Sequence, residues 1–282
     1  MFKNMFKTVI LLTVLGAFFI LVGSFFGQIG LIIGLVVALL FVGGSYWFSD
    51  KLAVRAAGAK PVTMEEAPEL YAIVQDLAYG ADIPMPRLYI SPDAQPNAFA
   101  TGRSPKKAVV CVTAGILQAL DRDELRAVLA HELGHVKNRD ILITSVAAAV
   151  ALAITFIARI AMWGAVFGGG DDEGGNIVGL LLLAILAPIA ALIIQMALSR
   201  SREFEADRTG AELIHDGEPL ARALQKIEAY AKQVPMDINP AQATAYIINP
   251  LTGRRVQFSN LFRTHPPTEQ RIQRLRSQQF TH

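Results

Sequence analysis

Cysteine is almost absent from this 282-residue chain, because Cys111 is the only one. A single cysteine excludes an intrachain disulfide and a cysteine-rich metal site. Its position in the apolar run 108–113 indicates a small buried residue. The chain also lacks an excess of charge of either sign, since its net charge is +2. Nothing in this composition supports nucleic-acid binding.

Charged residues are missing altogether between positions 8 and 49. This stretch has about twice the ~20 residues that a helix needs to cross a bilayer, and the turn-forming segment 27–30 interrupts it near the middle. We therefore expect a hairpin of two membrane-spanning helices. A cleaved signal peptide is the alternative for the first half, because Lys3 and Lys7 precede its apolar core. The core is long, however, and no small-residue cleavage site ends it.

Two further apolar segments, from 141 to about 167 and from 176 to about 198, predict a second membrane hairpin, with an acidic outer loop at 168–175. By the positive-inside rule, both termini and the region between the hairpins are cytoplasmic. The cations that flank the four spans are Lys3, Lys7, Lys51, Arg55, Lys60, Arg200 and Arg202. The expected organisation is hairpin 1–49, soluble part 50–140, hairpin 141–199 and soluble part 200–282.

The soluble part is expected to be mainly α with a small antiparallel β-sheet. Apolar periodicity predicts a helix at 65–79, and turn residues separate three extended runs. Asp121 and Glu124 form a capping-box pattern that opens the next helix, where Leu125, Val128, Leu129 and Val136 face a core. The remaining predicted elements are strands at 87–91, 98–101 and 107–113 and helices at 201–215, at 217–232 and after Pro266-Pro267.

The most informative motif is His131-Glu132-Leu133-Gly134-His135. On a helix, two histidines four positions apart lie on one face, so both imidazoles can bind the same Zn²⁺. Glu132 lies beside them, close to the metal yet free to act as a general base on a water molecule bound to it. The motif therefore predicts a catalytic zinc centre with one ion per chain.

A third ligand is expected from Glu203-Phe204-Glu205-Ala206-Asp207, which follows the fourth apolar segment. Glu203 and Asp207 share one helical face, whereas Glu205 points away. We expect Glu203 to bind the metal and Asp207 to accept a hydrogen bond from a ligating imidazole. Two histidines and one carboxylate leave a coordination position open, as catalytic zinc sites do.

The motif helix cannot itself lie in hydrocarbon, because eight charged residues flank the motif within 121–140. They are Asp121, Arg122, Asp123, Glu124, Arg126, Lys137, Arg139 and Asp140. From the helical rise we expect the metal on the order of 10 Å above the membrane interface. His265 is the best candidate in the sequence for a donor to a developing oxyanion. A helix-capping role ahead of Pro266 is the alternative for this histidine.

These motifs resemble those of the HtpX-type heat-shock membrane proteases, which are related to the CAAX prenyl endopeptidases. The resemblance runs along nearly the whole chain. It includes the four-span layout and the segments 96–102, 123–125, 131–135, 137–140 and 203–207, His265-Pro266-Pro267 and Arg271.

The resemblance implies a gluzincin-type zinc endopeptidase at the cytoplasmic face of the bacterial inner membrane. Such an enzyme degrades misfolded or damaged membrane proteins without ATP as part of a stress response. His265 would then donate to the transition state, with Arg271 in support. The segment 97–102 would bind substrate, because an edge strand can pair with an extended peptide. The implied contact residues are Asn97, Ala98, Phe99, Ala100 and Arg271.

Two other functions remain open. A protease that processes prenylated proteins would share the zinc motifs, but such enzymes resemble a longer chain with more spans around an enclosed chamber. A membrane-anchored scaffold with a structural metal would need a fourth ligand, and the intact Glu132 argues against it. Hydrolysis of unfolded casein with and without a chelator distinguishes the scaffold from the enzymes.

Overall fold

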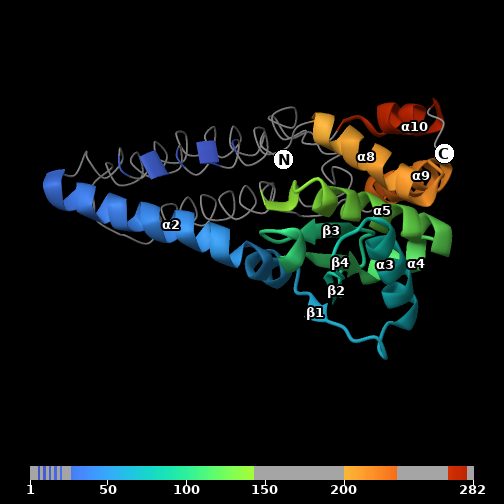
Figure 1. The fold of residues 1–282 in the computed structure, drawn as a ribbon, viewed down its shortest axis with the longest axis horizontal. Helices are drawn as coiled ribbons and strands as arrows, with labels where there is room; N and C mark the ends of the chain where they lie inside the picture. The colour runs from blue at the N-terminus through green and yellow to red at the C-terminus, as the bar shows by residue number, and fades with distance from the viewer. Residues whose placement is uncertain are drawn as a thin grey trace.

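The computed structural model describes residues 27–142, 200–233 and 266–277, together with a few positions between 6 and 20. Figure 1 shows how the elements are arranged. In chain order they are α2 (Gly27–Ala56), β1 (Lys60–Pro61), α3 (Pro68–Gly80), β2 (Arg87–Ser91), β3 (Ala98–Thr101), the 3₁₀ turn η1 (Pro105–Lys107), β4 (Val109–Thr113), α4 (Ala114–Ala119), α5 (Arg122–Lys137), α8 (Arg200–Ile214), α9 (Glu218–Gln233) and α10 (Thr268–Ser277).

The four strands form one mixed sheet in the order β1-β2-β4-β3. The central strand β4 is parallel to β2 and antiparallel to β3, and β1 is antiparallel to β2. The expectation of a purely antiparallel sheet is therefore wrong. After β2 the chain crosses to the far side of β4 and returns as β3, so that β2 and β4 run in the same direction.

β4 is buried along its whole length. Its apolar residues are continuous rather than alternating, which is typical of a strand that is covered on both faces. Thr113 at its end bonds to the segment that precedes β3. Its hydroxyl accepts a hydrogen bond from Asn97 N (2.9 Å) and donates to Gln95 O (2.7 Å). The same oxygen accepts from Ile116 N and caps α4. This contact fixes where the edge strand β3 begins.

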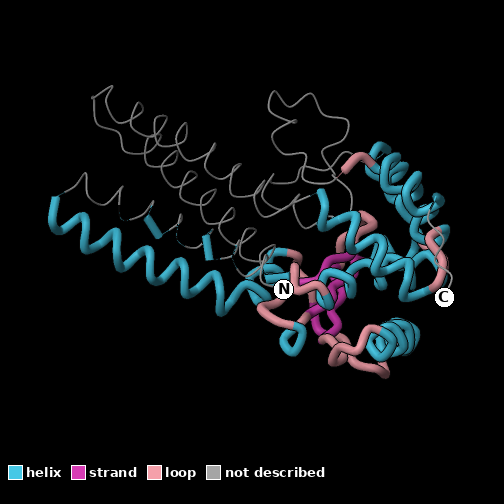
Figure 2. The backbone as a smooth tube through the Cα atoms, turned by 45° about the horizontal axis from the view of Figure 1, so that its top comes forward, coloured by secondary structure: helices cyan, strands magenta, loops and turns pink. Residues whose placement is uncertain are grey.

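α5 is the centre of the soluble part. It packs against β3 and α3 on one side and against α8 and α9 on the other, as Figures 1 and 2 show. The four apolar residues that the sequence assigned to its core face, Leu125, Val128, Leu129 and Val136, are all buried. Its start is fixed by a complete capping box, in which Glu124 N donates to Asp121 Oδ1 and Asp121 N donates to Glu124 Oε2.

Most of the predicted element positions agree with the structure, and the exceptions have local causes. α3 begins at Pro68 rather than at 65, because Thr63 and Glu66 bond to each other's backbone in a turn before the helix. β4 begins at Val109 rather than at 107, because η1 precedes it. β1 and α4 were not anticipated from the sequence.

α2 extends away from the sheet (Figures 1 and 2). It begins at Gly27, within the segment where a turn was expected, and several of its large apolar side chains are exposed. Of the helices that the structure describes, none combines the length and the apolar character that crossing a membrane requires. Apart from residues 141 and 142, the predicted second hairpin at 141–199 lies outside the described residues, as does most of the predicted first span.

Candidate metal centre

His131 and His135 lie on consecutive turns of α5 and face α8. Their rings are 4.8 Å apart and nearly perpendicular, with an interplanar angle of 86°. His131 is buried and His135 is mostly buried. The capping box and the buried apolar face of α5 set the helix in place, and the four-residue spacing then brings both imidazoles to one point.

Small residues let α8 approach α5 closely enough to complete the site. A Cβ at Gly210 would lie 2.7 Å from His131 N, and one at Gly134 would lie 3.1 Å from Ala206 O. Any larger side chain at Gly210 would force the two helices apart. The glycine inside the histidine motif therefore has a packing role, and it brings Glu203 within reach of both histidines.

Glu203 faces the two histidines from α8. Its Oε2 lies 3.9 Å from His131 Nε2, and its Oε1 lies 3.7 Å from His135 Nε2. One ligand atom from each of the three residues can be chosen within 4.8 Å of the others. Ligand atoms at ~2.1 Å from a tetrahedral zinc are ~3.4 Å from one another. The donor set and its spacing therefore fit a zinc ion with little adjustment.

Asp207 supports His131 from behind. Its Oδ1 lies 2.9 Å from His131 Nδ1, although the ring N–H is poorly aligned with that oxygen. Arg271 of α10 donates to both oxygens of Asp207, from Nε to Oδ2 (2.8 Å) and from Nη2 to Oδ1 (2.6 Å). Burial alone would raise the pKa of Asp207, but the Arg271 guanidinium lowers it to about 2. The carboxylate is therefore ionised at any physiological pH.

Arg271 is almost fully buried, with 1% of its surface exposed. Its guanidinium pairs with Asp207 and approaches Glu203, with Nη1 4.0 Å from Oε2. The sequence suggested that Arg271 contacts substrate. The structure instead places it behind the carboxylates, where it neutralises charge and ties α10 to α8.

Asp140 was assigned no role from the sequence, yet it stands behind His135 as Asp207 stands behind His131. Its Oδ2 lies 3.3 Å from His135 Nδ1. Arg139 has a positive φ of 59°, and Asp140 N donates to His135 O (2.9 Å), so the chain turns back at the end of α5. The sequence offered one indication of this role, because Asp140 is an aspartate just after the helix that carries the histidines.

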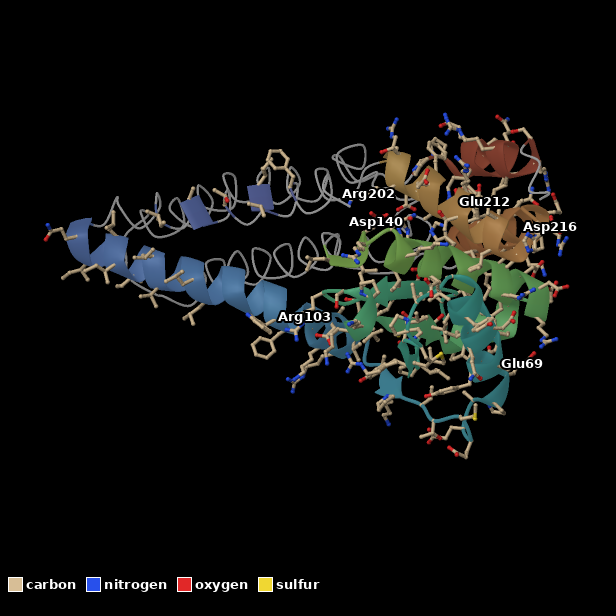
Figure 3. The ribbon with its side chains drawn as sticks, in the orientation of Figure 1. Glu69, Arg103, Asp140, Arg202, Glu212 and Asp216 are labelled. Atoms are coloured by element: carbon tan, nitrogen blue, oxygen red, sulfur yellow. The ribbon has the colours of Figure 1, made fainter. Side chains whose placement is uncertain are left out.

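Arg202 is a second residue that sequence reasoning missed. It is buried at the start of α8, and Figure 3 shows its side chain beside Asp140. Burial lowers the pKa of Arg202, and the negative charge of Asp140 opposes that shift. Behind each histidine of the motif thus lies a buried carboxylate, and near each of these carboxylates lies a buried arginine.

His135 is the more basic of the two histidines. Burial alone would lower its pKa, but the carboxylates of Asp140, Glu203 and Glu132 raise it to about 9. The pKa of His131, by contrast, is lowered by its burial. The carboxylates around His135 therefore favour positive charge at its ring, as the ligands of a divalent cation do.

Glu132 points to the opposite side, toward the edge of the sheet. Its Oε2 accepts a hydrogen bond from Ala100 N at 2.8 Å. Burial raises the pKa of Glu132 to about 7, while the positive charge of His135 opposes this shift. A carboxyl group with a pKa near 7 can both take up and release a proton at neutral pH.

β3 is an edge strand, and it lies alongside α5. Thr113 N donates to Asn97 O, and in the antiparallel register the backbone groups of Ala98 and Ala100 then point away from β4. The bond from Ala100 to Glu132 has this orientation. The predicted substrate segment therefore lies beside the predicted base. His265 lies outside the described residues.

Comparison with known proteins agrees with this geometry. The family model described as peptidase family M48 matches residues 64–279. A protein from Syntrophobacter fumaroxidans named protease HtpX homolog is 51% identical over 279 residues, which cover 96% of this chain and 98% of that protein. A protein of the same name from Pyrococcus furiosus is 53% identical over 253 residues, 89% of this chain and 87% of that protein.

The crystal structure of S. mikatae Ste24p is also similar, with a TM-score of 0.49 and 19% identity, over 97% of this chain and 66% of that one. The family match and the identity to these relatives extend over most of the chain. The chain belongs to peptidase family M48.

Proposed function

We propose that this protein is a zinc-dependent endopeptidase that cleaves misfolded or damaged membrane proteins at the cytoplasmic surface of the bacterial inner membrane, without ATP. One observation carries the proposal. Glu132 lies between the three clustered ligand atoms of His131, His135 and Glu203 on one side and the edge strand β3 on the other. A metal, a base and a strand that can hold a peptide are together what peptide-bond hydrolysis needs.

The metal would be held by His131, His135 and Glu203. A bound Zn²⁺ would polarise the scissile carbonyl and supply a nucleophile at neutral pH. Asp207 and Asp140 would keep each imidazole in the tautomer that presents Nε2 to the site. Arg271 and Arg202 would balance the charge of these two carboxylates.

Glu132 would move the proton. It would accept a proton from the attacking water and pass it to the nitrogen of the leaving amine. Burial raises the pKa of Glu132 above that of an ordinary carboxyl group, which makes it a stronger base for the first of these steps. The hydrogen bond from Ala100 N holds one oxygen and leaves the other for the reacting water.

The substrate would lie along β3 as an added strand. The backbone groups of Ala98 and the Ala100 carbonyl point away from β4, while the Ala100 N–H is bonded to Glu132. Neither alanine side chain is large enough to obstruct a peptide backbone. Main-chain pairing of this kind selects extended, unfolded segments and does not require a particular sequence. His265 remains our candidate for the oxyanion donor. This assignment is supported by Arg271, a few residues further along the chain, which anchors α10 beside the centre.

Membrane attachment is part of the proposal. It is supported by the uncharged stretch at 8–49, the apolar segments within 141–199 and the cations at the ends of these segments. The exposed apolar side chains of α2 are also consistent with a lipid environment. We propose four spans with both termini and the active site in the cytoplasm, so that the bilayer itself is one partner.

The proposal is tested with the purified full-length protein and unfolded casein. Wild-type protein should cleave casein, lose this activity with a chelator and regain it with added zinc. Glu132→Gln should bind as much zinc as wild type but cleave at least about 100-fold more slowly, because the base is gone. If Glu132→Gln cleaved casein at the wild-type rate, or if the chelator had no effect, the proposal would be wrong.

A further inference from the structure

A cavity of about 620 Å³ opens where the end of α2 meets the sheet, away from the candidate metal centre. It is formed by three segments, which are the last turns of α2, the start of β2 and the loop from β3 to β4. Its lining residues are Trp47, Phe48, Asp50, Lys51, Met85, Arg87, Arg103, Lys106, Lys107 and Ala108. None of these residues takes part in the proposed peptidase chemistry.

The cavity is strongly basic. It is lined by five cationic side chains and one carboxylate, Asp50, which pairs with Arg87 at 2.7 Å. Among the residues that the structure describes, no carboxylate pairs with the other four cations, Lys51, Arg103, Lys106 and Lys107. Four cations that converge on one hollow without a counter-charge favour an anion there.

Aromatic rings organise two of these cations. The Arg103 guanidinium lies over the Trp47 ring, 4.2 Å from its centre, and Lys51 Nζ lies 5.6 Å from the centre of the Phe48 ring. Trp47 is 58% exposed and Phe48 is 52% exposed. Stacking on an aromatic face holds a guanidinium in one orientation while its N–H groups remain available.

The loop that carries Arg103 and Lys106 is a defined structure. Gly102 has φ +129°, and a Cβ there would lie 2.5 Å from the backbone oxygen of Lys107, so that glycine is required. The turn η1 then places Lys106 and Lys107 at its end. A flexible basic tail would not present its charges in a fixed arrangement, whereas this loop does.

The cavity lies where the chain changes from apolar to charged. No charged residue occurs from position 8 to 49, and Asp50 and Lys51 follow directly. In membrane proteins, tryptophan and cations are concentrated at the membrane interface, where lipid headgroups meet water. Exposed Leu39 and Leu40, further up α2, offer apolar surface of the kind that acyl chains contact.

We propose that this cavity binds the phosphate headgroup of an anionic membrane lipid. Arg103 would hold the phosphate through its planar fork, with Lys51, Lys106 and Lys107 as further cations, and Trp47 and Phe48 would contact the glycerol and upper acyl region. The loop continues directly from β3, so a bound lipid would also fix the end of the proposed substrate strand. The inference rests on the proposed membrane attachment.

The test uses full-length protein in neutral detergent, mixed with phosphatidylglycerol or phosphatidylcholine, and native mass spectrometry to count the lipids retained. Wild type should retain one phosphatidylglycerol in preference to phosphatidylcholine. Arg103→Gln/Lys106→Gln should weaken this binding on the order of 30-fold, since each cation near an anionic lipid contributes about fivefold.

A matched control and a rescue variant separate a site from general surface charge. Arg122→Gln/Arg126→Gln removes an exposed and a half-buried cation near Glu69 and Asp76, at the other end of the soluble part, and should bind like wild type. Arg103→Lys/Lys106→Arg keeps both charges and should restore most of the affinity. Melting curves of all variants are the check that each one is folded.

Several results would overturn the inference. Equal loss in the two Gln variants would indicate diffuse attraction, and equal retention of phosphatidylcholine would exclude recognition of the anionic headgroup. Inorganic phosphate alone, binding with the same dependence on Arg103, would identify a free-anion site instead. Alkaline extraction of cell membranes tests attachment separately from the casein assay. Release of the protein into the soluble fraction would contradict both the proposed membrane attachment and the proposed lipid site.

Discussion

Asp140 Oδ2 lies 3.3 Å from His135 Nδ1, so that the second histidine of the motif has a buried carboxylate behind it, as the first has Asp207. Both carboxylates are in turn close to a buried arginine, Arg202 for Asp140 and Arg271 for Asp207. The two histidines are therefore supported in the same way, by residues from the end of α5, from α8 and from α10.

Asp140→Asn should lower zinc affinity by about 10- to 100-fold, because the His135 ring loses the charge that orients it and strengthens it as a ligand. Competition with a chelating dye measures this on the purified protein, and a melting curve checks the fold. Asp123→Asn is the matched control, since Asp123 is exposed on the same helix and should have no effect. Unchanged affinity in Asp140→Asn would show that Asp140 does not support the ligand.

Glu203→Ala should remove most of the bound zinc, whereas Glu205→Ala should leave it unchanged. Glu203 is buried and faces both histidines, while Glu205, two residues later on the same helix, is exposed. Metal analysis of the two purified variants by mass spectrometry provides the measurement. The reverse pattern would mean that the third ligand has been misassigned.

Ala100→Pro should reduce casein hydrolysis by at least about fivefold, since it removes the N–H that holds Glu132, a bond with a net value of ~1 kcal/mol, and obstructs the edge of β3. Zinc content and melting temperature should change much less, because the N–H faces away from β4. Ala100→Gly keeps the N–H and should remain active. Equal loss of zinc and activity in Ala100→Pro would point to a purely structural strand.

The proposed topology predicts which positions a membrane-impermeant thiol reagent can reach in intact cells. Gly174→Cys should react from outside, whereas Glu65→Cys should react only after the cells are opened. Cys111 should contribute no background, because it is buried and its burial raises the pKa of the thiol to about 12, so that almost no thiolate forms at neutral pH. Labelling of position 65 from outside would place the active site on the opposite face.

Local sequence patterns predicted the local structure well. The strands at Arg87–Ser91 and Ala98–Thr101 and the capping box of α5 agree with the structure, because each is encoded by neighbouring residues. The order of the strands does not follow from such patterns. Nothing near β2 indicates that β4, rather than β3, will be its neighbour, and the antiparallel expectation failed for this reason.

The same distinction applies to the candidate centre. Helical periodicity grouped His131 with His135 on one helix and favoured Glu203 over Glu205 on another, and the structure brings the three together. The roles of Asp140 and Arg202 depend on how the end of α5 turns and on how α8 packs against it. The burial of Arg271 against Asp207 likewise depends on the docking of α10, which no local pattern encodes.

The close contact between Gly210 and His131 has a consequence for the order in which this protein matures. The candidate centre draws on α5, α8 and α10, and its residues extend from position 131 to 271, so it cannot form from any local stretch of chain. Contacts between residues so distant in sequence form only after the entropy cost of closing long loops has been met. A newly made or partly folded copy would therefore lack a complete centre, and proteolytic capacity would arise only together with the finished tertiary structure.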